Sequence, residues 1–107
     1  MRTITADQLP IADNPHGVDV RHLYKTADVV VSQITLRPGE IVKPHQAPVD
    51  VFFYVLEGTP TIEIEGETVK PAPDTLVPSA LGHTHAIRNE STATVRLLVV
   101  KTPNPKP

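Results

Sequence analysis

The stretch DVFFYVLEG (residues 50–58) is rich in β-branched and aromatic residues and therefore predicts a strand that ends in a turn at Gly58. Side chains of a strand point alternately to its two faces. Each face of this strand carries three apolar residues: Val51, Phe53 and Val55 on one face, and Phe52, Tyr54 and Leu56 on the other. Both faces need cover, so we expect one to line a barrel interior and the other to meet a second sheet or a partner subunit.

Further segments of the chain have the same character as this strand. They are short, rich in β-branched residues and separated by turn residues such as Pro38-Gly39 and Glu65-Gly66. The segments are residues 18–25, 28–36, 60–65 and 93–101. Twelve prolines oppose long helices, because each one removes a backbone donor. The pattern predicts an all-β sandwich or barrel.

Length and composition restrict the possible functions of the chain. The 107 residues predict one domain, with residues 102–107 as an extended tail. A net charge of −2 without a basic stripe argues against nucleic acid as a partner. The chain has no cysteine, so a metal ion would need histidine or carboxylate ligands. Because no apolar run is long enough for a membrane span or a leader peptide, we expect a cytoplasmic protein.

Five histidines are the candidate functional residues. We expect His16, in a turn composition, and His22, in a strand with polar residues, to lie on the surface. His83 and His85 are two residues apart, so an extended backbone would place both imidazoles on one face. Two such nitrogens can bind a divalent transition metal, but they can equally form the polar lining of a pocket. The residues alone leave both interpretations open.

Two longer motifs resemble those of the cupin superfamily, whose members are small β-barrels of jelly-roll type. In PGEIVKPHQAPVDVFFYVLEG (residues 38–58), Gly39, His45 and Gly58 match the first cupin motif. In DTLVPSALGHTHAIRN (residues 74–89), the ends match the second motif, with Pro78 at the start and His85 and Asn89 at the end. The resemblance covers about residues 28–100 and implies a single cupin β-barrel over residues 1–107.

The first cupin motif departs from the family pattern at two metal-binding positions. Ala47 stands where the family has a second histidine, and Val51 stands where it has a glutamate. His83 is an additional histidine beside the second motif, and it could replace the missing imidazole if it shares a face with His85. The resemblance carries over His45 and His85 as metal ligands, and with His83 as the third ligand we expect an ion of nickel, zinc, iron, manganese or copper on His45, His83 and His85. Ala47, Val51, Phe53 and Val55 would line an apolar pocket.

Two functions follow from this resemblance. The first is a metal-binding cupin that acts on a small molecule as a dioxygenase or an isomerase. The alternative is a metal-free cupin that binds a small molecule or regulates another process without catalysis. In both cases the doubly apolar strand predicts a homodimer, and the sequence does not identify the ligand or show whether the protein is an enzyme.

Overall fold

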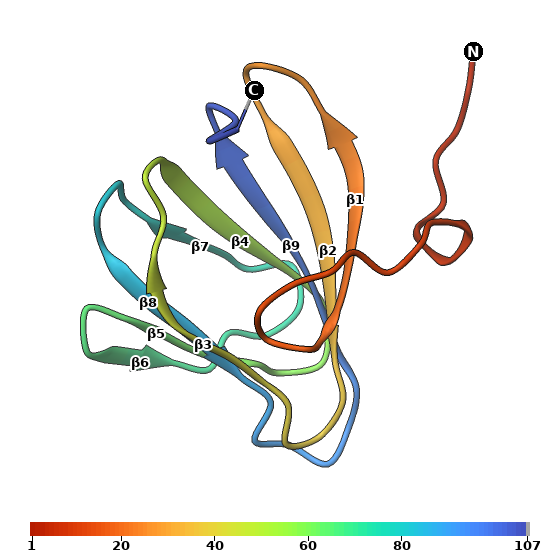
Figure 1. Cartoon of the computed structure of the whole chain (residues 1–107). Coiled ribbons are helices and arrows are strands. Elements are labelled where there is room, and N and C mark those ends of the chain that lie inside the picture. Colours follow the sequence, from red (N-terminus) through yellow and green to blue (C-terminus); the bar gives the residue numbers. More distant parts are fainter. Residues whose placement is uncertain (107) are drawn as a thin grey trace.

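The computed structural model describes residues 1–106, which form nine strands in two antiparallel sheets that face each other (Figure 1). The first sheet has the order β1-β2-β9-β4-β7, and the second has the order β3-β8-β5-β6. The strands are β1 (Asp19–Lys25), β2 (Val30–Leu36), β3 (Ile41–Gln46), β4 (Asp50–Glu57), β5 (Thr61–Ile64), β6 (Glu67–Val69), β7 (Leu76–Ser79), β8 (Thr84–Arg88) and β9 (Val95–Thr102). The all-β jelly-roll prediction is confirmed. Within residues 1–106, no helix is long and apolar enough to cross a membrane.

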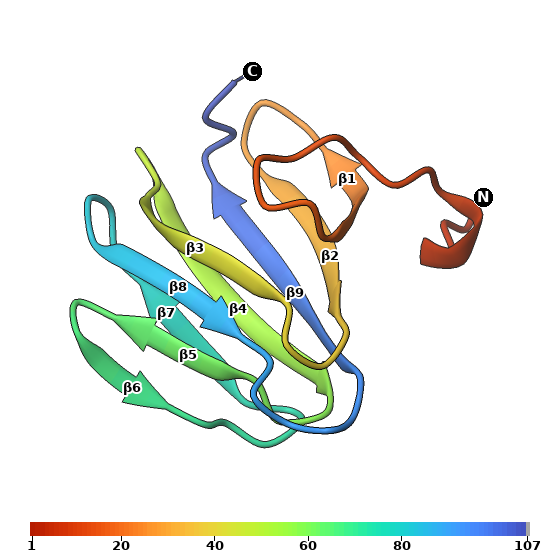
Figure 2. The ribbon, with the colours of Figure 1, turned by 60° about the horizontal axis from the view of Figure 1, so that its bottom comes forward.

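The two sheets face each other (Figure 2), and buried apolar side chains from both of them form the hydrophobic core. In β4, Val51, Phe53 and Val55 are buried, whereas the alternate side chains are only half-buried on the outer face. Burial of a side chain as large as Phe53 contributes about 2–3 kcal/mol to folding. The second sheet supplies Ile62 and Ile87 to the same core. The two faces predicted for residues 50–57 are therefore those that the structure shows.

The buried side chain of Asn89, which follows β8, connects several segments at one end of the barrel. Its amide nitrogen donates to the carbonyl oxygens of Leu36 (2.9 Å) and Ala93 (2.8 Å). Its amide oxygen accepts hydrogen bonds from the backbone N–H and the hydroxyl of Ser91. Asn89 thereby connects the end of β2, the end of β8 and the segment that leads into β9.

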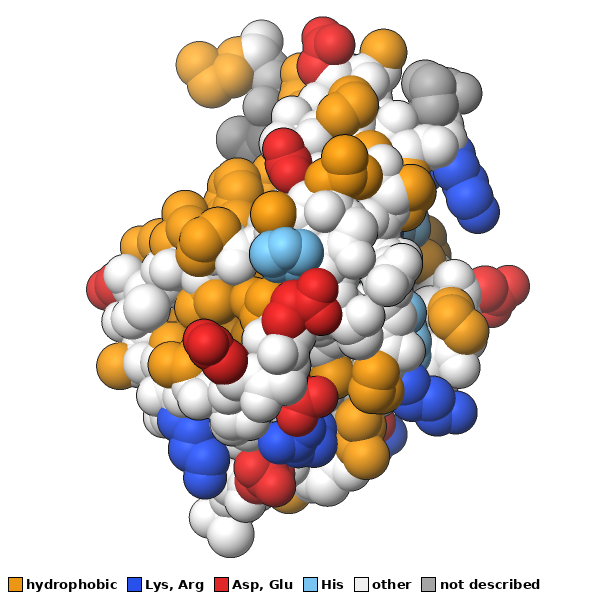
Figure 3. All heavy atoms as spheres, turned by 90° about the vertical axis from the view of Figure 1, so that its left-hand side faces the viewer, with side chains coloured by type: hydrophobic (Ala, Val, Ile, Leu, Met, Phe, Trp, Pro, Cys, Tyr) orange, Lys and Arg blue, Asp and Glu red, His pale blue; other side chains and the backbone are white. Residues whose placement is uncertain are grey.

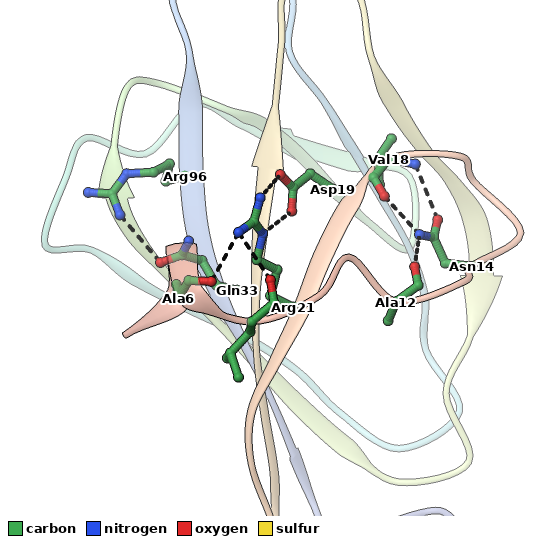
Figure 4. Close-up of polar contacts among 9 residues, drawn as sticks. Ala6, Ala12, Asn14, Val18, Asp19, Arg21, Gln33 and Arg96 are labelled. Atoms are coloured by element: carbon green, nitrogen blue, oxygen red, sulfur yellow. Dashed lines mark hydrogen bonds and ion pairs between the residues drawn. The ribbon is translucent and has the colours of Figure 1, made fainter. Parts of the chain in front are cut away.

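The N-terminal segment runs alongside β1 and is fixed to it by side chains (Figure 4). It contains one turn of 3-10 helix, η1 (Ala6–Gln8). Arg21 of β1 donates to the carbonyl oxygens of Ala6 (3.1 Å) and Leu9 (3.2 Å) and forms an ion pair with Asp19 (2.9 Å). Further along, the side chain of Asn14 donates to the carbonyl oxygen of Val18 (2.8 Å), which closes the loop that precedes β1.

The C-terminal segment folds back onto the barrel, although we expected residues 102–107 to be an extended tail without contacts. β9 continues to Thr102, and Asn104 then makes two hydrogen bonds to the turn between β1 and β2. Its backbone N–H donates to the carbonyl oxygen of Ala27 (3.2 Å), and its side chain donates to that of Thr26 (3.0 Å). Pro107 lies outside the described residues.

We predict that the chain forms a homodimer through the outer face of the first sheet. Phe52, Tyr54 and Leu56 are half-buried there, and residues 4–7 line a hollow of this face together with Leu56 and Leu98. We predict that Leu56→Glu shifts a dimer to the monomer, because a buried charge in an apolar interface costs several kcal/mol. Light scattering at micromolar concentration measures the shift.

The control for this dimer prediction is Val69→Glu. Val69 is an exposed apolar residue of β6, in the other sheet, so this substitution adds the same charge away from the proposed interface. It should leave the dimer intact. A wild-type protein that is monomeric under these conditions would contradict the prediction directly.

Candidate functional site

A cavity of about 420 Å³ opens between the two sheets at the end of the barrel opposite Asn89. This volume is within the range of pockets that bind small molecules. Its apolar wall consists of Val20, Val30, Ile34, Val42, Phe53, Ile87 and Val99. Its polar lining includes four histidines and three lysines: His16, His22, His45, His85, Lys25, Lys101 and Lys106. Of the predicted pocket residues, Phe53 lines this cavity, whereas Ala47, Val51 and Val55 lie in the buried core.

His45 and His85 form a close pair in this cavity. They lie directly opposite each other in the antiparallel pairing of β3 and β8. Their Nε2 atoms are 3.3 Å apart, and the two rings meet edge to face at a centroid distance of 4.5 Å. The ring of Phe53 also packs edge to face against His85 at 5.1 Å. The strand pairing thus brings together two of the three histidines that the sequence singled out.

Hydrogen bonds determine which ring nitrogens of this pair carry protons. His45 Nδ1 lies 2.8 Å from the carbonyl oxygen of Lys43, which can only accept, so Nδ1 is the donor and Nε2 of neutral His45 has the lone pair. His85 must then donate from its Nε2 to His45. This leaves His85 Nδ1 to accept the hydroxyl proton of Ser79 at 3.0 Å.

Burial keeps the His85 ring neutral at physiological pH. Burial lowers the pKa of His85, and the nearby charges of His45 and Lys101 lower it further, from 6.5 to about 4. The cost of protonating His85 in the folded protein is therefore large. His85 consequently presents a neutral imidazole to the cavity.

His16 and His22 also belong to the cavity, although we expected both on the solvated surface. His16 Nδ1 accepts a hydrogen bond from the backbone N–H of Lys43 (3.1 Å), so its Nε2 carries the proton in the neutral ring. Burial lowers the pKa of His16, as do the charges of His45, Lys43 and Lys101. His22 Nδ1 is 2.8 Å from the hydroxyl of Ser32, and burial likewise lowers its pKa.

A β-bulge in β1 turns Lys25 toward the cavity. The pairing of β1 with β2 shifts its register between His22 and Tyr24. Without the shift, Lys25 would alternate to the face opposite His22, but the extra residue puts both on the cavity side. The pattern of apolar and polar residues contains no sign of this bulge. Nor does it predict the position of the loop that carries His16, whose backbone N–H donates a hydrogen bond to Oδ1 of Asn14.

The structure places His83 away from His45 and His85, and our expectation that it shares a face with His85 is wrong. β8 begins only at Thr84, so the strand alternation does not reach His83. His83 instead ends a turn in which its backbone N–H donates to the carbonyl oxygen of Ala80 (3.0 Å). Its exposed side chain lines a separate hollow with Glu65 and Glu67. Figure 3 shows this side of the barrel, where hydrophobic and acidic side chains lie close together.

The side chains of the cavity do not fit the predicted metal ion. His45 and His85 bring two imidazole nitrogens within 3.3 Å, and the His16 ring lies 5.3 Å from the His45 ring, but a stable ion in a protein usually needs three or more protein ligands. The Nδ1 lone pair of His16 is already used by the N–H of Lys43. Within residues 1–106, no group of three histidine, aspartate or glutamate side chains is placed to hold an ion.

Lys101 is the most buried lysine of the cavity. It lies on β9 on the same face as Val99 and Leu97, and its register partners are Val30 and Val51. Its ammonium group has no carboxylate within 4 Å among residues 1–106. Burial lowers the pKa of Lys101, and the charge of Lys106 lowers it further. The inward alternation of β9 could have identified this residue from the sequence.

Comparison with known proteins identifies the family to which these features belong. The cupin domain family matches residues 32–101 of the chain. Among curated proteins, none matches the sequence. The solved structure of TT1209 from Thermus thermophilus is 27% identical, with 96% of this chain and 98% of that chain covered and a TM-score of 0.81.

Two further solved structures have the same fold at lower identity. The polyketide cyclase RemF from Streptomyces resistomycificus is 21% identical, with 97% of this chain and 80% of that chain covered and a TM-score of 0.84. A predicted oxalate decarboxylase from Thermotoga maritima is 18% identical, with 96% of this chain and 100% of that chain covered and a TM-score of 0.84. At these identities the likeness shows a shared fold.

Proposed function

Because this chain belongs to the cupin family, we propose that the open end of its barrel binds a small organic anion, an apolar molecule that carries a carboxylate. The observation that supports this proposal is Lys101, an inward-facing cation in an apolar cavity that has no carboxylate within 4 Å among residues 1–106. A buried charge is costly unless it is paired, and an anionic ligand would pair it.

The apolar wall defines the other half of the proposed ligand. Phe53, Ile87 and Val42 line the cavity beneath the histidine pair. A hydrocarbon chain or ring laid against this wall leaves water, which contributes about 25 cal/mol for each Å² of apolar surface removed. The cavity therefore suits a molecule with an apolar body and one charged end.

The charges of the lining favour an anion over a neutral or cationic ligand. Lys25, Lys101 and Lys106 line the cavity, and Asp13 is the one acidic residue among its described lining residues. The Nε2–H of neutral His16 provides a further donor. A carboxylate can accept from several such donors, and hydrogen bonds between ionised groups are about twice as strong as those between neutral groups.

The metal-dependent alternative has less support from this geometry. A dioxygenase or isomerase reaction on an ion held by His45, His83 and His85 would need His83 in the cavity, and His83 lies in a turn outside it. Binding of an anion by the lysines and histidines needs no ion.

Calorimetric titration with hexanoate and its neutral analogue hexanamide tests the proposal. The two probes have the same apolar chain, so a difference in affinity reports the charged end. We expect wild type to bind hexanoate at least about ten times more tightly than hexanamide, and Lys101→Met to lose most of that preference. A chelating agent should leave the affinity for hexanoate unchanged.

The matched control for this titration is Lys70→Met, which removes a lysine that does not line the cavity. It should bind hexanoate like wild type. Equal affinity of wild type for the two probes, or no binding of either, would show that the cavity does not bind an apolar anion.

A further inference from the structure

Lys101 differs from an ordinary anion-binding lysine in its surroundings. Its neighbours in the two strand pairings are Val30 and Val51, so its hydrocarbon stem runs between apolar residues. The titratable groups whose charges interact with it are Lys106, His16, His22 and His85, and all of them are basic. No carboxylate among residues 1–106 lies within ion-pair distance of its ammonium group.

Burial and the charge of Lys106 lower the pKa of Lys101, so a larger fraction of it is neutral amine than of an ordinary lysine. Burial removes water from the charged form, and a second lysine nearby repels it. A lysine that is desolvated or placed beside another cation is a nucleophile, because a larger fraction of it carries a free lone pair at neutral pH. Lys101 meets both conditions, and it faces a cavity large enough for a small molecule.

We propose that the amine of Lys101 forms an imine with the carbonyl carbon of a 2-oxo acid bound in this cavity. The inference rests on the proposed anion site and names its substrate class. In a 2-oxo acid the carbonyl and the carboxylate are adjacent, so one molecule can present both to the same cluster of lysines. Lys25 and Lys106 line the same cavity, and they stay available for the carboxylate once Lys101 has reacted.

The reaction is a condensation that needs no oxidant or reductant. The lone pair of the Lys101 nitrogen attacks the carbonyl carbon, and the oxygen takes up a proton as the C–N bond forms. The C–O bond then breaks, and the hydroxyl leaves as water after a second protonation. The nitrogen loses its two protons over the two steps. The imidazole of His22, which lines the cavity and whose Nε2 has no hydrogen-bond partner among residues 1–106, can accept and return these protons.

Reductive trapping of pyruvate tests this inference. The full chain is incubated with pyruvate and sodium cyanoborohydride at about pH 7, where a lysine with a lowered pKa has more neutral amine than an ordinary lysine. Intact mass and peptide mapping then locate the reduced adduct. We expect one adduct for each chain, on Lys101, formed at least about ten times faster than on any other lysine. Acetone, which lacks the carboxylate, should label Lys101 far more slowly.

Two substitutions serve as matched variants in the trapping experiment. Lys101→Arg keeps the positive charge but has no nucleophilic amine, so it should lose the adduct. Lys70→Arg makes the same change outside the cavity and should label like wild type. Peptide mapping of the wild type needs no variant, so the inference is testable even if Lys101→Arg fails to fold.

The trapping and the hexanoate titration separate the inference from the proposed function. Labelling spread over the five lysines and the N-terminus according to exposure would overturn the imine, and charge-dependent binding of hexanoate would then still support the anion site. If hexanoate does not bind and pyruvate does not label Lys101, both proposals are wrong. A specific adduct on Lys101 without hexanoate binding would support the imine and reject the apolar anion.

Discussion

Gly58→Ala is expected to destabilise the protein by about 3 kcal/mol, as backbone strain and a steric clash act together. Gly58 follows β4 in the left-handed region (φ +77°), where a residue with a Cβ is strained by roughly 1–2 kcal/mol. A Cβ built there would also lie 2.5 Å from the carbonyl oxygen of Thr94 and 3.0 Å from a methyl carbon of Val95. The Thr94 oxygen belongs to the backbone that leads into β9, so it cannot move aside without shifting a core strand.

Gly66→Ala provides the matched control for this prediction. Gly66 has almost the same backbone angle (φ +82°), but nothing lies within 4 Å of its added Cβ. Its substitution should cost only the backbone strain, roughly 1–2 kcal/mol. Urea denaturation of both variants measures the difference. If Gly58→Ala and Gly66→Ala lose equal stability, the close approach of Gly58 to Thr94 does not constrain the fold.

Acidification from about pH 7.5 to about pH 4 is expected to destabilise wild type by about 3 kcal/mol more than it destabilises His85→Gln. Burial and the charges of His45 and Lys101 lower the pKa of His85 from 6.5 to about 4 in the folded protein. Between these values the unfolded chain binds a proton and the folded chain does not. The free energy of unfolding therefore falls as the pH falls, by about 1.4 kcal/mol for each unit of difference in pKa.

Urea denaturation at the two pH values measures this effect. The contribution of His85 should be fully present above pH 6.5 and lost by about pH 4. His83→Gln is the control, because it makes the same substitution at an exposed histidine outside the cavity. It should follow the pH dependence of wild type. An equal loss of stability in wild type and His85→Gln would show that burial of His85 does not oppose its protonation.

Local alternation explains what could be predicted from the sequence. Residues 50–57 are long and strongly apolar, so the strand rule assigned both faces of β4 correctly. His45 and His85 lie within strands, and the structure brings them into direct contact. In these segments the position of a residue along the strand determines which face its side chain occupies, so alternation between the two faces is sufficient to predict it.

Three residues were misplaced or missed because the strand rule does not apply to them. His83 lies one residue before β8, in a turn. Lys25 turns inward because of a bulge, whose position depends on the pairing with β2. His16 reaches the cavity through a loop held by the side chain of Asn14. Each of these positions depends on contacts between segments that are not regular in sequence, and periodicity carries no information about them.

The buried amide of Asn89 has a consequence for how this barrel can change during evolution. Asn89 holds the carbonyl oxygens of Leu36 and Ala93, and a replacement there would leave buried carbonyl groups without donors. Mutations at that end of the barrel reduce the stability of the fold, so we expect its residues to change little. The opposite end, around the cavity, includes the loop with His16 and the segment around Asn104. Substitutions there can alter ligand preference while the contacts of Asn89 hold the other end of the barrel together.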